Sequence, residues 1–81
     1  MNQDKVRNII EATLKAGEKT PGLFDLPKIM GVKSKLESCS AIDDVVGVLE
    51  ENRGLLCKAF GLGVDAFDQG VVRLKALDDA A

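Results

Sequence analysis

Apolar residues recur at intervals of three and four along nearly the whole 81-residue chain, and this spacing constrains the fold more than any other feature. It gathers apolar side chains on one face of an α-helix, whereas a half-buried strand needs strict alternation. The pattern covers residues 4–16, 26–39, 41–60 and 65–77. We therefore expect an all-α, compact single domain spanning 1–81. It should contain about four helices, as a bundle or an orthogonal helical array, with a short frayed acidic tail at 78–81.

Residues that favour helix ends lie between these segments. Asn2 is a suitable N-cap for the first helix, because its side-chain oxygen can accept a backbone amide hydrogen there. Ser40 and Asp43 have the spacing of a capping box at the start of the third helix. Gly61 is a suitable end for that helix, since glycine adopts the left-handed conformation at no steric cost.

The segment 41–60 should be the central helix, because its apolar stripe is broad enough to contact neighbours on more than one side. We expect Leu49 and Leu56 to be buried at its centre. Ile10 in the first helix and Phe67 in the last should be among their neighbours.

The second helix should direct Leu26, Ile29 and Met30 toward the core. Phe24, which comes just before this helix, should also fold into the core. Gly31 either ends the helix or lies inside it, where it is about 1 kcal/mol less favourable than alanine.

The composition argues against an enzyme. The chain contains no His, Trp or Tyr, which removes the commonest general base and the commonest zinc ligand. Neighbouring carboxylates on a helix point about 100° apart, so the acidic pairs are not expected to chelate a metal. We expect no catalytic residue, no metal site and no cofactor.

Cys39 and Cys57 are too few for a disulfide framework, and we expect both to be reduced thiols in a cytoplasmic protein. The charged N-terminal residues do not resemble a secretory signal, and no apolar run approaches the roughly 18 to 20 residues of a membrane span. A reactive Cys39 would need the start of the third helix to lower its pKa. We favour a packed thiol without a partner base.

Gly47, Gly54 and Gly61 are spaced by seven residues. On one helix this spacing places them nearly on one line, so we expect Gly47 and Gly54 to allow close approach of another helix, from the same chain or from a partner. Glu51 lies on the same segment and is a candidate interaction residue with them. Gly61 is more simply explained as the helix end.

Residues 55–77 also have the residue spacing of a helix-turn-helix, with a small residue and a glycine where two helices cross. In this alternative, contacts to nucleic acid would come from Lys33, Lys35, Arg73 and Lys75. However, the reading helix opens with Asp65 and Asp68, which repel phosphates, and the chain has a net charge of −2. We therefore do not expect nucleic acid to be the partner.

Two segments resemble acyl carrier proteins, which are acidic four-helix domains of this length. Residues 5–10 look like their opening helix, and residues 45–51 look like their acidic second helix. The resemblance implies a phosphopantetheine arm on the serine of an Asp-Ser-Leu motif at a helix start. The nearest serine here is Ser40, which lies between Cys39 and Ala41, so the attachment motif is not matched.

These features together predict a small, non-catalytic helical protein-interaction module. Its partner would be another protein or a second copy of the chain, since a domain this small with a wide apolar stripe gains stability by association. The helix-turn-helix protein is the alternative, and the acyl-carrier-like domain ranks third.

Overall fold

Five α-helices form the computed structural model, which describes residues 2–80 and the side chains of residues 2–77. They are α1 (Gln3–Lys15), α2 (Leu26–Glu37), α3 (Ile42–Glu51), α4 (Arg53–Phe60) and α5 (Val64–Ala80). The all-α prediction is therefore confirmed, although the helices number five instead of four. Gly31 lies inside α2 and does not divide it.

The additional helix arises because the segment 41–60 is divided at Asn52. The backbone of Asn52 has φ −110° and ψ 16°, and its side-chain Nδ2 donates to the carbonyl oxygen of Val48 at 2.8 Å. Asparagine side chains compete for backbone hydrogen bonds in this way and interrupt helices. The sequence contains a signal for the break, because the positions three and four after Leu49 are Asn52 and Arg53 instead of apolar residues.

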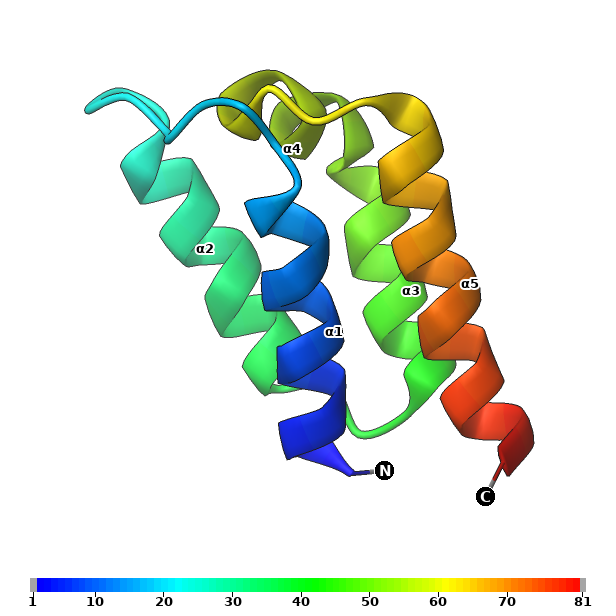
Figure 1. The fold of residues 1–81 in the computed structure, drawn as a ribbon. Helices are drawn as coiled ribbons and strands as arrows, with labels where there is room; N and C mark the ends of the chain where they lie inside the picture. Colours follow the sequence, from blue (N-terminus) through cyan, green and yellow to red (C-terminus); the bar gives the residue numbers. More distant parts are fainter. Residues whose placement is uncertain (1, 81) are drawn as a thin grey trace.

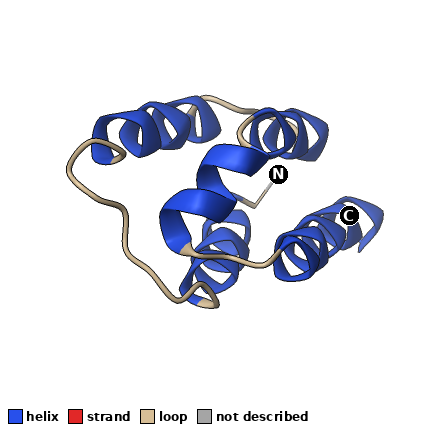
Figure 2. Cartoon of the chain, turned by 90° about the horizontal axis from the view of Figure 1, so that it is seen from above, coloured by secondary structure: helices blue, strands red, loops and turns tan. Residues whose placement is uncertain are grey.

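Four of the helices, α1, α2, α3 and α5, lie side by side and alternate in direction, while α4 lies across one end (Figures 1 and 2). The most extensive packing joins α1 to α5, followed by α3 to α5 and α2 to α3. The helix α4 contacts α1, α3 and α5. The result is a four-helix bundle closed at one end, and its radius of gyration of 11.9 Å matches the roughly 12 Å of a compact chain of this length.

The centre of the bundle agrees with the predicted core. Leu56 is 2% exposed and Leu49 is 6% exposed. Both line the same small pocket, of about 10 Å³, as Ile10 and Phe67. The prediction of these four neighbours is therefore confirmed. The other buried members of this core are Val6, Cys39, Ile42, Val45, Val46, Leu62, Val71 and Leu74.

A close contact between α1 and α5 depends on Gly70 in α5. A Cβ at this position would overlap the side chain of Thr13 in α1, whose hydroxyl donates to the carbonyl oxygen of Ile9 at 2.8 Å. The absence of a side chain at Gly70 thus allows α1 and α5 to approach closely. Within the described chain, Gly70 makes a close helix contact and Gly47 and Gly54 do not.

The loop after α1 is attached to the end of α4. The backbone amide of Lys19 donates to the carbonyl oxygen of Phe60 at 2.9 Å, and that of Glu18 donates to Gly61 at 3.3 Å. Gly61 ends α4 as expected, with a positive φ of 60°. A Cβ at Gly17 would overlap the carbonyl group of Phe60, so the loop lies directly against the end of α4.

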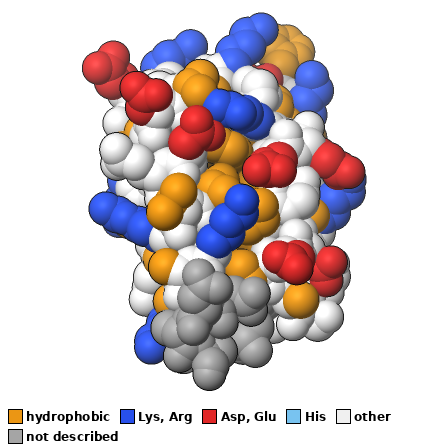
Figure 3. Space-filling view, turned by 90° about the vertical axis from the view of Figure 1, so that its right-hand side faces the viewer, with side chains coloured by type: hydrophobic (Ala, Val, Ile, Leu, Met, Phe, Trp, Pro, Cys, Tyr) orange, Lys and Arg blue, Asp and Glu red, His pale blue; other side chains and the backbone are white. Residues whose placement is uncertain are grey.

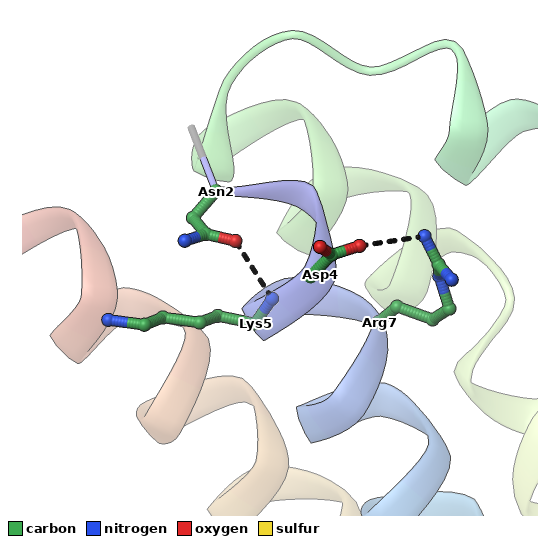
Figure 4. A network of polar contacts seen from close by, with 4 residues as sticks. All are labelled: Asn2, Asp4, Lys5 and Arg7. Carbon is green, nitrogen blue, oxygen red and sulfur yellow. Dashed lines mark hydrogen bonds and ion pairs between the residues drawn. The ribbon is translucent and has the colours of Figure 1, made fainter.

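The helix ends confirm one predicted cap and exclude another. The backbone amide of Lys5 donates to Asn2 Oδ1 at 3.1 Å, and Asp4 and Arg7 form an ion pair at 3.1 Å one turn into α1 (Figure 4). The capping box at Ser40 is wrong, because no side chain caps the start of α3. Where a frayed tail was expected at 78–81, α5 continues to Ala80; Ala81 lies outside the described residues.

Truncation of Leu49 should test the central position of this residue. Leu49→Ala removes a buried side chain that lines the central pocket together with residues of α1, α4 and α5. We expect it to lower the free energy of unfolding by about 2 to 5 kcal/mol. Urea denaturation followed by circular dichroism measures the change. The control is Val72→Ala on α5, where the side chain is 64% exposed and the change should stay within about 0.5 kcal/mol. Equal effects would contradict the assignment.

Candidate protein-interaction surface

The predicted glycine track is not formed within the chain. Gly47 is exposed on α3 and Gly54 is exposed on α4, so the break at Asn52 separates them onto two helices. A Cβ at either glycine would meet no atom within 4 Å. This excludes a close helix neighbour from the same chain for both glycines and leaves close approach by a partner as a prediction. Glu51 is also exposed on α3, and its role in binding a partner, like that of the two glycines, remains a prediction.

The four basic residues of the nucleic-acid alternative lie on different helices. Lys33 and Lys35 are exposed on α2, and Arg73 and Lys75 are exposed on α5. These helices form opposite edges of the bundle (Figure 1). On the α5 side, acidic and basic side chains are interspersed with hydrophobic ones (Figure 3). The structure therefore does not bring these four cations together on one face.

Asp68, near the start of α5, forms an ion pair with α4, although α5 would be the reading helix of the nucleic-acid alternative. The carboxylate of Asp68 lies 3.1 Å from the guanidinium of Arg53 in α4, and both side chains are about half exposed. The same guanidinium lies 5.7 Å from the centre of the Phe67 ring. The pairing joins α4 to α5 as a packed helical hairpin, and it directs Arg53 toward a carboxylate instead of toward a phosphate.

Cys39 is buried between α2 and α3, and its thiol donates to the carbonyl oxygen of Lys35 at 3.1 Å. Burial raises the pKa of this thiol, and the nearby carboxylate of Asp44 raises the pKa further. The thiol is therefore a weaker nucleophile than an exposed cysteine at neutral pH. Because the folded state holds this proton more tightly, folding stability falls as the pH rises above the ordinary thiol pKa. Ser40, the serine next to it, is exposed.

A cluster of exposed apolar residues lies where the sequence analysis expected core residues. Phe24 is 93% exposed, Leu23 84%, Met30 66% and Leu26 41%, on the loop before α2 and on its first two turns. The prediction that Phe24 and Met30 join the core is wrong. Only Ile29 of the expected inner face is half-buried, because the row that faces the core continues from Ile29 to Val32 and Leu36. We call Leu23, Phe24, Leu26 and Met30 the apolar end.

A groove runs between α1 and α2, which form the side of the bundle with the least helix packing. Its volume is about 760 Å³. The floor is apolar and consists of Val6, Ile10, Leu14, Ile29, Val32 and Leu36. Val6 and Val32 are buried, while the other four are only half-buried. The groove thus leaves part of an apolar helix pair open to solvent.

Charged residues form the two lips of this groove. Arg7 and Glu11 lie along α1, and Lys33 and Glu37 lie along α2. Since the two helices are antiparallel (Figure 1), Arg7 and Glu37 lie toward the end with the chain termini. Glu11 and Lys33 each lie one turn further along. Each lip therefore carries one charge of each sign.

Among the described side chains, those of residues 2–77, no group of three or more histidine, cysteine or acidic residues is placed to hold a metal ion. No helix within residues 2–80 has the length and apolar composition needed to cross a membrane.

A glycine-to-alanine substitution at each site distinguishes the open position of Gly54 from the closely packed position of Gly70. Gly54→Ala replaces an exposed helical glycine that has open space around it, so the higher helix propensity of alanine should raise the free energy of unfolding by up to about 1 kcal/mol. Gly70→Ala brings the same propensity gain but forces Thr13 away, and it should lower the free energy of unfolding. Urea denaturation of both variants measures this difference. Stabilisation by Gly70→Ala would contradict the close α1–α5 contact.

The two cysteines should differ in reactivity. Cys57 is partly exposed, whereas Cys39 is buried with a raised thiol pKa. We expect iodoacetamide to alkylate Cys57 at least about tenfold faster than Cys39 in the folded protein, as measured by mass spectrometry. In denaturant the two rates should become similar. Fast alkylation of folded Cys57→Ala protein would show that Cys39 is accessible after all.

Comparison with known proteins identifies no relative, since no protein family, curated protein or solved structure matches the chain.

Proposed function

We propose that the protein is a small, non-catalytic interaction module that binds a protein partner through the open side of its bundle. The binding surface consists of the apolar end together with the groove between α1 and α2. The observation that carries this proposal is the exposure of four large apolar side chains at one place, beside a groove with an apolar floor.

Exposed apolar clusters of this kind are costly in water and are typical of binding surfaces. Phe24 and Leu23 contribute little to the core, because they are almost fully exposed. Their presence is therefore not explained by the stability of the isolated fold. An apolar groove between two helices with charged lips is a common way to bind an amphipathic helix.

The proposal places the protein in the cytoplasm. Cys39 and Cys57 are free thiols, which persist in a reducing compartment. The raised pKa of the Cys39 thiol favours a packing role over a nucleophilic one and supports the non-catalytic part of the proposal.

Photo-crosslinking in cells that express the full chain tests the proposal. Replacing Phe24 with p-benzoylphenylalanine keeps an aromatic side chain at an exposed position and should not disturb the fold. We expect a discrete crosslinked product from position 24, with the attached protein identified by mass spectrometry. The matched control carries the same residue in place of Gln69, which is exposed on α5. No product from position 24, or the same products from both positions, would overturn the proposal.

A stability control accompanies the crosslinking. The double variant Phe24→Ser with Met30→Ser should change the free energy of unfolding by less than about 1 kcal/mol, because both side chains are exposed. A large loss of stability in this variant would show that the apolar end supports the fold of the single chain instead.

A further inference from the structure

We propose that the partner bound at the open side is a second copy of this chain, in a dimer with a two-fold axis parallel to the helices. This inference rests on the proposed function and specifies the occupant of its surface. In such a dimer, α1 of each copy packs antiparallel against α2 of the other. The α1 and α2 helices of both copies together then form a four-helix bundle at the centre of the dimer.

A ridge of side chains borders the groove on each side. Residues separated by four, seven and eleven positions lie in one row along a helix. On α1 this row is Gln3, Arg7, Ile10 and Leu14; on α2 it is Leu26, Met30, Lys33 and Glu37. Apart from Leu26 and Met30, all of these residues line the groove. Each ridge therefore borders the open side.

Both ridges change from polar to apolar in the same direction in space. The polar half of α1 is its N-terminal half, and the polar half of α2 is its C-terminal half. Because the helices are antiparallel, the polar halves lie together near the chain termini, and the apolar halves lie together near α4 (Figure 1). A two-fold axis parallel to the helices keeps the height of each residue along the bundle unchanged, so each residue lies opposite partner residues at the same height. Apolar residues then meet apolar residues, and charges meet charges.

The charges at the polar level are complementary in this arrangement. Since α1 faces α2 of the other copy, Arg7 meets Glu37 of the partner subunit, and Glu11 meets Lys33 of the partner subunit. In an isologous dimer each pair occurs twice. Among the described residues, Glu11, Lys33 and Glu37 make no ion pair within the chain. Arg7 contacts Asp4, but a guanidinium has five N–H donors and can bind a second carboxylate.

The apolar level supplies the remaining contact. Ile10, Leu14 and Ile29 are only half-buried in the single chain, while Leu26 and Met30 are exposed. The helix α1 has 13 residues, which gives the face a length of about 20 Å. Two helices about 8 to 10 Å apart give it a similar width. A face of this size is smaller than a standard specific interface and falls in the range of weak, transient contacts, so we expect a dimer with an affinity no better than micromolar.

Sedimentation equilibrium tests the dimer up to several hundred micromolar protein. We expect the mass to rise from that of one chain, 8.6 kDa, to twice that value as the concentration increases. Arg7→Glu and Glu37→Lys each place like charges opposite each other twice per dimer. Each variant alone should weaken association at least about tenfold.

Mixing the two variants provides the decisive measurement. In a mixed dimer the new carboxylate at position 7 faces the new ammonium at position 37, and the other pair is unchanged. Association should therefore return to within about threefold of the original value, which a merely structural effect of either substitution would not produce. Lys58→Glu and Glu50→Lys are the matched controls, because both residues are exposed outside the groove, and neither should affect association.

Three outcomes overturn the dimer. They are a mass of 8.6 kDa at every concentration, a dimer that neither reversal weakens, and mixed variants that fail to associate. The crosslinking experiment separates this failure from failure of the proposed function. A product from position 24 with a different protein would retain the interaction module and exclude the second copy as its partner. A product with the mass of two chains supports both.

Discussion

The packing of α1 against α5 is the contact on which the rest of the structure depends. It joins the two helices that are furthest apart in the sequence, and it is the most extensive helix pair in the bundle. Its closeness requires Gly70, since any side chain there would displace Thr13. Because α1 packs against α5 instead of against its sequence neighbour α2, the side between α1 and α2 remains open. The candidate binding surface between α1 and α2 is thus a direct consequence of the packing of the first helix against the last.

The sequence predicted the helices and the core centre well, because burial in a helix imposes a periodic pattern. Leu49 and Leu56 could be assigned to the core from that pattern alone, and so could Ile10 and Phe67. The division at Asn52 could also have been found. Two polar residues occupy the positions where the apolar stripe should continue, but the broad stripe on either side concealed them. Helix breaks of this kind can be predicted from the neighbouring residues alone, without knowing how the helices pack.

The candidate site was harder to predict, because it depends on which helices become neighbours. Leu26, Ile29 and Met30 form one broad apolar face of α2, and only the positions of α1 and α3 decide which edge of that face is buried. The same applies to the glycines. Gly54 and Gly70 both lie within predicted helices, and nothing in their local sequence indicates that a neighbouring helix approaches only Gly70. Phe24 was assigned to the core from its hydrophobicity alone, whereas its loop is held against the end of α4 by backbone hydrogen bonds at residues 18 and 19.

The position of the two chain ends has a practical consequence. Asn2 and Ala80 lie at the same end of the bundle, opposite α4 (Figure 1). A domain, a fluorescent label or a solid support attached at either terminus is therefore held away from Leu23 and Phe24. A tandem fusion would need only a short flexible linker, because the end of one copy and the start of the next can lie at the same pole. In that geometry two linked copies would present their apolar ends in the same direction, away from the linker.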